Sequence, residues 1–280
     1  MTLPTPARDR TALVTGASSG IGREIARQLA GRGHGLTLVA RREDRLRALA
    51  GELGDAHGVR VEVAAADLTG EAERDRLAAA VAERGLAVSV LVNAAGLSTV
   101  GPVHASDPRA EAAMIRTDVE ALAHLCSLFL PGMVERGRGA VLNVASTAAF
   151  QPLPGQAAYA ASKAFVVSYS YALRGELRGT GVAVTALCPG PVDTEFAETA
   201  GFDSAAALSA LPRFMWEPAE RVAEAGLAGL ERGRAVVIPG IANRAGATAA
   251  HLAPRSLLTP LLASRHPGLR RSRPEAPSPS

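Results

Sequence analysis

The chain has 280 residues, of which 48% are hydrophobic and 20% charged, a composition that supports a folded core and excludes a disordered or collagen-like protein. Its formal charge of +3 resides in the last sixteen residues, which hold four arginines and one glutamate, so the rest of the chain is neutral. This balance argues against a nucleic-acid partner. The sequence shows no apolar run of membrane-spanning length, no apolar signal segment near its start and only two cysteines. We therefore expect a cytoplasmic protein with no membrane contact.

Short apolar segments recur along the chain, and each is followed by a longer segment with helical spacing of its apolar residues. Continuous apolar strands of this kind are buried on both faces, and helical connections arrange them in parallel. We predict an α/β fold, a three-layer doubly wound (Rossmann) parallel sheet of about seven strands with helices on both faces. The predicted strands are Ala12–Thr15, Leu36–Ala40, Val59–Ala64, Val88–Asn93, Ala140–Ala145, Val182–Leu187 and Ala235–Ile238. The predicted helices are Gly20–Gly31, Glu43–Leu53, Glu71–Arg84, Pro108–Glu135, Gln156–Arg178 and Pro218–Glu231.

A glycine-rich turn joins the first predicted strand to the first predicted helix. Its glycines are spaced GxxxGxG, which allows a tight turn and lets a pyrophosphate approach the backbone at the start of a helix. A loop without a ligand is the alternative, but the strand before it and the helix after it favour nucleotide binding. The predicted cofactor-binding residues of this turn are Gly16, Ser18, Ser19, Gly20, Ile21 and Gly22.

The end of the second predicted strand indicates which dinucleotide binds. A site for NAD places an acidic residue there, whereas Ala40 stands at that position in this chain and Arg41 and Arg42 follow it. A guanidinium can make paired, charge-assisted hydrogen bonds to a 2′-phosphate. We expect NADP(H) to be favoured over NAD(H), the alternative being that the two arginines are the solvated start of the next helix.

Tyr159 and Lys163 lie four residues apart in a predicted helix, which places the phenol and the ammonium on one face. A nearby ammonium favours the phenolate and so lowers the tyrosine pKa. Lys163 is the single lysine of the chain, beside 29 arginines. The small side chains around the pair, such as Ala160 and Ala161, are not those of a solvated helix. The pair is therefore a candidate for proton transfer.

Together these segments resemble the short-chain dehydrogenase/reductase family, in its single-domain branch, over about residues 8–240. The resemblance implies that Ser146 polarises a substrate carbonyl, that Tyr159 is the general acid or base, and that Lys163 lowers the pKa of Tyr159 and binds the nicotinamide ribose. It implies no metal, and the six histidines show no metal-ligand spacing. The motifs that carry it are TGASSGIG at 15–22, Asp67-Leu68, NAAG at 93–96, NVAS at 143–146, YAASK at 159–163 and PGPVDT at 189–194. Further cofactor contacts implied by the family pattern come from Asp67, Leu68, Asn93, Ala94, Gly96, Pro189, Val192 and Thr194.

Asp118 departs from the family pattern, which usually has Asn at this fourth active-site position. The family residue acts largely through its backbone carbonyl, a role that survives the change. A carboxylate near Lys163, however, stabilises the ammonium and alters the proton relay. Two functions therefore stay open: an NADP(H)-dependent oxidoreductase that interconverts a carbonyl (ketone or aldehyde) and an alcohol, and an NADP-binding sensor or scaffold with little turnover.

Substrate contacts are expected from Phe150, Phe196 and Phe202, and Trp216 is expected either in the core or in the substrate pocket. We predict one dinucleotide-binding domain over 1–240 with a substrate lid at about 194–216, a helical extension over 241–264 and a disordered basic, proline-rich tail over 265–280. Forty residues after position 240 are too few for the larger substrate domain of a sugar-nucleotide epimerase. The family pattern also implies a homodimer or homotetramer acting on a small molecule.

Overall fold

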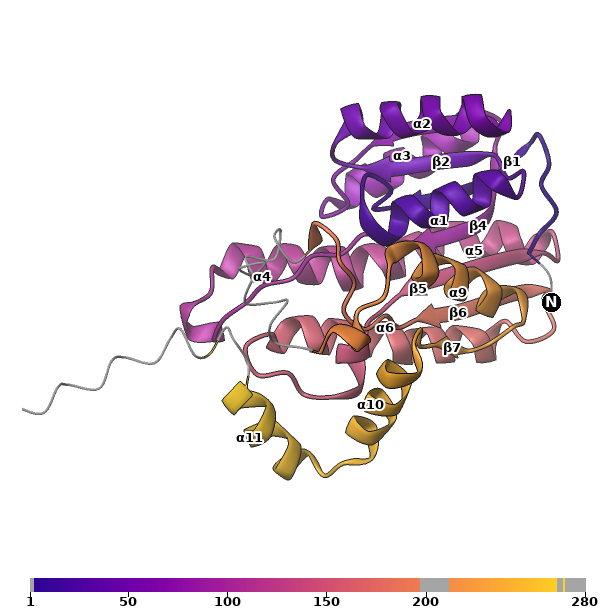
Figure 1. Cartoon of the computed structure of the whole chain (residues 1–280). Helices are drawn as coiled ribbons and strands as arrows, with labels where there is room; N and C mark the ends of the chain where they lie inside the picture. Colours follow the sequence, from indigo (N-terminus) through magenta and orange to yellow (C-terminus); the bar gives the residue numbers. More distant parts are fainter. Residues whose placement is uncertain (1–2, 197–211, 266–268, 270–280) are drawn as a thin grey trace, which may run out of the picture.

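Residues 3–196, 212–265 and 269 are described by the computed structural model. Its centre is a parallel sheet in the order β3-β2-β1-β4-β5-β6-β7 (Figure 1). The chain runs outward from β1 to β3, returns to pair β4 with β1, and then continues to β7 on the other side. The strands are β1 (Arg10–Thr15), β2 (Leu36–Ala40), β3 (Val61–Ala65), β4 (Ala87–Asn93), β5 (Gly139–Val144), β6 (Val182–Leu187) and β7 (Val236–Val237).

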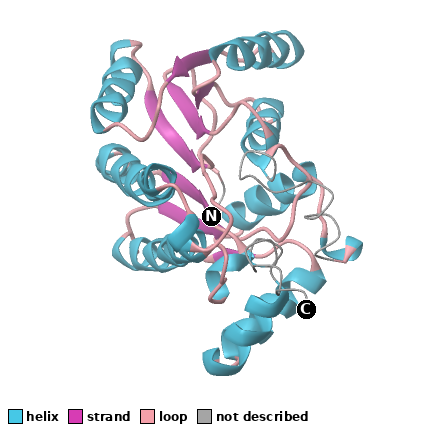
Figure 2. Ribbon diagram, turned by 90° about the vertical axis from the view of Figure 1, so that its left-hand side faces the viewer, coloured by secondary structure: helices cyan, strands magenta, loops and turns pink. Residues whose placement is uncertain are grey.

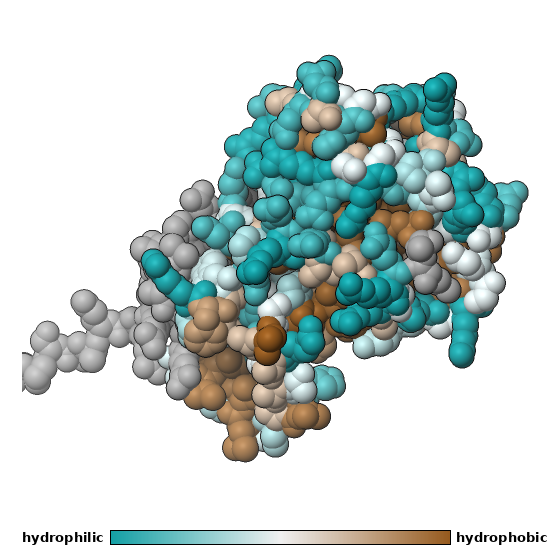
Figure 3. All heavy atoms as spheres, turned by 45° about the vertical axis from the view of Figure 1, so that its right-hand side comes forward, coloured by the Kyte–Doolittle hydropathy of each residue, from teal (hydrophilic) through white to brown (hydrophobic). Residues whose placement is uncertain are grey.

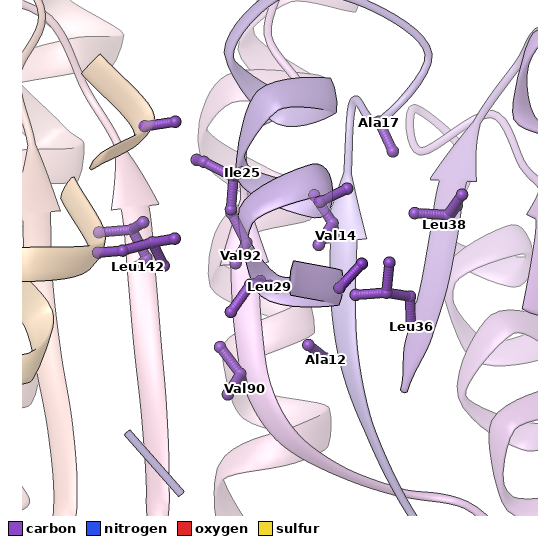
Figure 4. Packing of buried hydrophobic residues seen from close by; sticks show 14 of the residues in the cluster. Ala12, Val14, Ala17, Ile25, Leu29, Leu36, Leu38, Val90, Val92 and Leu142 are labelled. Atoms are coloured by element: carbon purple, nitrogen blue, oxygen red, sulfur yellow. The ribbon is translucent and has the colours of Figure 1, made fainter. Parts of the chain in front are cut away.

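Helices cover both faces of this sheet because successive strand residues point to opposite sides (Figure 2). Ala12 and Val14 of β1 join one apolar cluster, where Ile25 packs on the strands, as Figure 4 shows. Leu13, between them, joins the other cluster together with Leu125. Helices α1 (Gly20–Gly31), α2 (Glu43–His57) and α9 (Ala219–Glu231) contribute to the first cluster. Helices α3 (Glu71–Glu83), α5 (Leu122–Glu135) and α6 (Ala157–Glu176) contribute to the second.

The predicted doubly wound sheet is confirmed, and the predicted strands and helices all occur; β2, β6 and α1 have the predicted bounds, and the others have shifted ends. One predicted helix differs in kind. The segment predicted as a single helix over 108–135 consists of α4 (Pro108–Ile115), a π-helical turn η2 (Arg116–Ala121) and α5. Asp107 caps α4 by accepting a hydrogen bond from the Arg109 N–H at 2.9 Å. The π turn contains Asp118 and turns its side chain into the protein interior.

Beyond β7 the chain forms two further helices, α10 (Ile241–Leu252) and α11 (Arg255–Arg265), which project from the body of the molecule (Figure 1). They occupy the segment expected to be a helical extension. Residues 197–211 of the predicted lid, and the predicted tail apart from Arg265 and Leu269, lie outside the described residues. Among the helices of residues 3–196 and 212–265, none combines the length and apolarity needed to cross a membrane.

Candidate active site

A cleft of about 750 Å³ opens at the carboxyl ends of the strands. Open α/β sheets bind ligands at this edge, where the strand order reverses, and here the reversal falls between β1 and β4. Thr15 fixes the two strand ends to each other, because its hydroxyl oxygen accepts hydrogen bonds from the Ala94 and Ala95 N–H groups, both at 3.0 Å. The sequence motif contains Thr15, but reasoning from the sequence gave it no role.

The glycine turn after β1 has no room for side chains. Gly16 has φ +66°, and a Cβ on it would lie 2.8 Å from the Ala94 carbonyl oxygen. A Cβ on Gly22 would lie 2.5 Å from the Gly16 carbonyl oxygen. Ser19 precedes α1 at the N-cap position and makes no capping hydrogen bond with its side chain, which leaves first-turn N–H groups for a phosphate. All six predicted residues of this turn line the cleft.

Arginines gather beside this turn at the end of β2. Arg42 donates hydrogen bonds to the hydroxyls of Ser18 and Ser19, each at 3.1 Å, and forms an ion pair with Glu195 at 2.9 Å. Arg45, which the sequence analysis did not select, pairs with the same carboxylate at 2.7 Å. These hydrogen bonds from Arg42 and Arg45 lower the pKa of Glu195. The cleft therefore has a basic wall at this end, which Arg41 extends as an exposed lining residue.

The predicted adenine contacts, Asp67 and Leu68, also line this end of the cleft. The Asp67 side chain is held in place, because its Oδ1 accepts hydrogen bonds from the Thr69 N–H at 3.0 Å and the Thr69 hydroxyl at 2.9 Å. Thr194 comes from the opposite side, where a Cβ on Gly20 would lie 3.2 Å from its methyl group. The glycine turn is thus enclosed between the β2 end and the segment after β6.

Ser146, Tyr159 and Lys163 line the same cleft farther along. Ser146 follows β5 in extended conformation, and its hydroxyl oxygen accepts a hydrogen bond from the Ala148 N–H at 3.1 Å. Tyr159 lies in the first turn of α6, with the Lys163 Nζ 5.6 Å from its ring centroid. The Lys163 Nζ also donates to the Val144 carbonyl at 3.3 Å. The structure thus places Ser146, expected to polarise a carbonyl, in the same cleft as the Tyr159–Lys163 pair expected for proton transfer.

Asp118 forms a buried ion pair with Lys163. The Asp118 Oδ2 lies 2.9 Å from the Lys163 Nζ, and neither side chain is more than 6% exposed. The Leu97 N–H donates to the other carboxylate oxygen at 2.7 Å. Gly96 lies against the pair, since a Cβ there would approach the Lys163 Nζ to 3.3 Å. The carboxylate of the π turn η2 is therefore buried together with its counter-ion.

The charges in this cluster act on one another. Burial alone lowers the pKa of Lys163, but the Asp118 carboxylate and the Tyr159 phenol outweigh it, so the pKa is raised and the ammonium stays protonated. Tyr159 lies deep in the cleft and keeps part of its surface open to it, and its burial raises the pKa of the phenol. Lys163 and a hydrogen bond with Ser146 lower the pKa of Tyr159, as the sequence analysis expected for Lys163, but Asp118 opposes them and the net shift is upward.

Other predicted residues lie in different surroundings. Asn93 lies in the protein interior and does not line the cleft. Its side-chain amide donates a hydrogen bond to the Asn143 Oδ1 at 2.9 Å. The Phe150 ring packs edge-on against His251 of α10, with centroids 6.1 Å apart, and does not line the cleft. The Phe196 ring lies 6.0 Å from the Tyr159 ring, and Trp216 lines the cleft. Phe202 lies outside the described residues.

Ala94, Gly96, Pro189 and Val192 line the cleft, as expected for cofactor contacts. The cleft also has lining residues that the sequence did not indicate, among them Leu97, Gln156 and Leu262. Across residues 3–196 and 212–265, no group of three or more His, Cys, Asp or Glu side chains is arranged to hold a metal ion.

Comparisons with known proteins agree with this geometry. A family model described as short chain dehydrogenase matches residues 10–204. Sulfoacetaldehyde reductase 2 of Chromohalobacter salexigens is 41% identical over 66% of this chain and 73% of its own length. The NADP-dependent 3-hydroxy acid dehydrogenase of Salmonella typhi is 40% identical over the same shares of the two chains. A short-chain dehydrogenase from Sphingobium yanoikuyae, solved in complex with NADPH, superimposes with a TM-score of 0.76 at 33% identity, over 96% of this chain and 98% of that one.

Proposed function

The chain belongs to the short chain dehydrogenase family of oxidoreductases, and on that premise we propose that it interconverts a ketone or aldehyde and an alcohol with NADP(H). One observation carries the proposal: Ser146, Tyr159 and Lys163 line the same cleft as the glycine turn and its arginines. The cleft therefore offers a dinucleotide site and proton-transfer groups side by side. The named relatives are a reductase and a dehydrogenase, which favours turnover over a sensor or scaffold role.

The residues present fit NADP(H). Gly16 and Gly22 form a cradle that any Cβ would fill, as close approach of a pyrophosphate requires. Arg41 and Arg42 supply cations for a 2′-phosphate, and Ala40 places no carboxylate there. The relative from Salmonella typhi is named NADP-dependent and the Sphingobium enzyme was solved with NADPH, in keeping with this preference. When bound, the nicotinamide supplies or accepts the hydride.

In the reducing direction, Ser146 and Tyr159 act on the substrate oxygen. Their hydroxyls donate hydrogen bonds to the carbonyl oxygen, so that negative charge developing on it during reduction meets donors already in place. Tyr159 then gives its proton to this oxygen, which becomes the alcohol hydroxyl, and takes a proton back from solvent. In oxidation the phenolate accepts the alcohol proton.

Lys163 supports both directions because its ammonium favours the phenolate. Asp118 has a positioning role in this proposal: its carboxylate holds the Lys163 Nζ at 2.9 Å and keeps it protonated inside the protein. It also weakens the effect of Lys163 on the Tyr159 pKa. The exchange of the usual Asn for Asp118 thus tunes the proton-transfer group and leaves Ser146, Tyr159 and Lys163 in place.

The test is reduction of a panel of aldehydes and ketones with NADPH and, separately, NADH, followed by the loss of nicotinamide absorbance. We expect turnover with NADPH, slower turnover with NADH, and a loss of about 100-fold in kcat/KM for Ser146→Ala, the scale of removing one oxyanion donor. Ser127→Ala removes an exposed hydroxyl of α5 and is the matched control. Tight NADPH binding without conversion of any carbonyl or alcohol would favour the sensor function.

We also propose a cytoplasmic homodimer or homotetramer that associates through α5 and α6. Large apolar side chains are exposed on these helices, with Val134 at 39%, Phe165 at 38% and Tyr171 at 54% exposure. Sedimentation analysis tests this proposal. A Phe165→Glu variant should shift the protein toward monomer, and an unchanged oligomer would contradict the assignment of this face.

A further inference from the structure

Helix α10 is held beside the cleft by contacts at both of its ends. In its first turn, the buried side chain of Asn243 donates to the Met215 carbonyl at 2.9 Å. Asn243 also lies against the chain after β6, where a Cβ on Gly190 would come within 2.3 Å of its Oδ1. In the last turn, His251 packs on Phe150, which follows Ser146 by four residues. Phe150 therefore orients the helical extension.

Helix α11 follows after a short break at Ala253 and Pro254 and reaches back to the cleft. Leu258 and Leu262, four residues apart, are half-buried on one face of this helix, and Leu262 lines the cleft. Leu257 and Leu261 face away, with exposures of 72% and 47%. Figure 3 shows apolar side chains gathered on the projecting lower part of the molecule, where Figure 1 draws these helices.

The part of the cleft on this side has an apolar lining. Its described lining residues beyond Tyr159 carry no charge, and all of them except Thr147, Gln151 and Gln156 are apolar. Gln156 is one of the polar residues there, and its side-chain amide donates a hydrogen bond to the Ser98 hydroxyl at 2.8 Å. These lining residues are Leu97, Thr147, Ala148, Gln151, Leu153, Gln156, Phe196, Pro212, Trp216 and Leu262.

A carboxylate, sulfonate or phosphate group on the substrate would have no unpaired cationic side chain beside it among the described residues of this part of the cleft. Among the cleft-lining residues that the structure describes, the guanidinium groups are those of Arg41 and Arg42 at the glycine turn, and Lys163 is already paired with Asp118. An anion placed against uncharged apolar side chains would lose its hydration without a partner.

We propose that α11 forms an apolar wall of the substrate site, with Leu262 contacting the non-reacting hydrocarbon part of a neutral ketone or aldehyde. This inference rests on the proposed function, because it places the substrate carbonyl at Tyr159. It assigns a specificity-determining residue outside residues 10–204, the segment that the family match covers. The substrate class is a neutral carbonyl compound with an extended apolar tail.

Binding tests this proposal independently of turnover, because Trp216 is the single tryptophan of the chain and lines the cleft. Its fluorescence is titrated with decan-2-one and with 9-oxodecanoate, which share the methyl ketone and differ in ending with a methyl or a carboxylate. NADP⁺ is present, so that no reduction occurs. We expect decan-2-one to bind at least about tenfold more tightly, since a buried, unpaired carboxylate is strongly disfavoured.

Two leucines of α11 provide the matched variants. Leu262→Ala should weaken decan-2-one binding about five- to tenfold, as expected for lost apolar contact, and Leu262→Met should restore most of it. Leu261→Ala removes the same atoms from the exposed face and should leave the affinity unchanged. In NADPH assays, the ratio of kcat/KM for decan-2-one to that for butan-2-one should fall in Leu262→Ala and not in Leu261→Ala.

Equal or tighter binding of 9-oxodecanoate would overturn the proposal, as would equal effects of Leu262→Ala and Leu261→Ala on decan-2-one. The predicted affinity pattern without any NADPH-dependent turnover would support the apolar wall and count against the proposed function alone.

Discussion

The exchange Asp118→Asn perturbs the proton-transfer cluster with the smallest change in shape. Asn can keep the hydrogen bond from the Leu97 N–H, which now goes to the Asp118 Oδ1 at 2.7 Å. It removes the negative charge that lies 2.9 Å from the Lys163 Nζ. The ammonium then stays in the protein interior with the Val144 carbonyl as its remaining hydrogen-bond acceptor among the described residues.

The structure sets the scale of the effect on stability. Two unit charges at this separation attract each other by about 6 kcal/mol at an effective dielectric constant of about 20. Much of that attraction offsets the desolvation of the two ions, and removing one partner of a buried pair costs about 3 to 5 kcal/mol. Because Asn retains one hydrogen bond, we expect about 3 kcal/mol, or a fall of about 5 °C in Tm for a chain of this size.

The pH dependence has a definite sign. The folded protein raises the pKa of Lys163, so while Asp118 is ionised the stabilisation by the pair is complete below the unfolded-state pKa of lysine, about 10.4, and is lost as the pH rises through the folded-state value. Burial also raises the pKa of the Asp118 carboxyl, so the ion pair is lost on the acid side as well, once the pH falls through that raised pKa. The stability difference between wild type and Asp118→Asn should therefore be largest in the pH range where Asp118 is ionised and Lys163 is protonated, and should shrink at strongly alkaline pH and at the lower pH where Asp118 takes up a proton. Asp118 also raises the pKa of Tyr159, so the variant should have a lower one.

Two assays read these effects. Urea unfolding at several pH values gives the stability, and kcat/KM for alcohol oxidation as a function of pH gives the apparent pKa of the base. Oxidation needs the phenolate, so the variant should reach full activity at a lower pH than wild type. Asp55→Asn changes an exposed carboxylate of α2 and should alter neither measurement. An unchanged stability together with an unchanged or upward-shifted pH profile would refute the reasoning.

Three further predictions follow from the same geometry. Replacing both Arg41 and Arg42 with Ala should weaken NADPH binding about 10- to 100-fold and NADH binding far less, because charged hydrogen bonds to the 2′-phosphate are lost. Calorimetry measures both affinities, and equal weakening of the two would contradict binding of the 2′-phosphate by these arginines. Gly16→Ala should lower the free energy of unfolding by about 2 kcal/mol more than Gly85→Ala, since both have positive φ but only Gly16 has backbone within 3 Å of the added Cβ, and forcing an extra methyl group into filled space costs about 1 to 3 kcal/mol. Burial raises the pKa of Cys188 to about 12, so iodoacetamide at pH 8 should leave it unmodified by mass spectrometry, and rapid alkylation would contradict its burial.

The sheet and the glycine turn could be predicted because their signals are local. Buried parallel strands are continuous apolar runs, and the tight turn at Gly16 requires the positive φ that glycine adopts readily. The Tyr159–Lys163 spacing likewise places both side chains on one helix face. Ser146 needed the family pattern, because a serine after a strand has no distinctive local signal.

The remaining features depend on contacts between distant segments. Glu195 meets Arg42 and Arg45 across about 150 positions of the chain, and no sequence period indicates such a pair. Phe150 stands close to Ser146 in sequence, yet it packs on α10 because His251 lies there. Leu262 reaches the cleft because the contacts of α10 with Met215 and Phe150 set the direction of the chain that leads into α11. Neither the spacing of Leu262 in the sequence nor its residue type could predict that position.

Reduction of a neutral ketone by Tyr159→Phe, in a single turnover with bound NADPH, tests the central claim most directly. The variant removes the phenolic oxygen and keeps the ring against Phe196, and Tyr171→Phe changes an exposed tyrosine of the same helix as a control. The account predicts unchanged NADPH affinity with a rate at least about 100-fold lower, the scale of general acid catalysis, and a control at the wild-type rate. A Tyr159→Phe protein that reduces the ketone as fast as wild type would show that the proton comes from elsewhere.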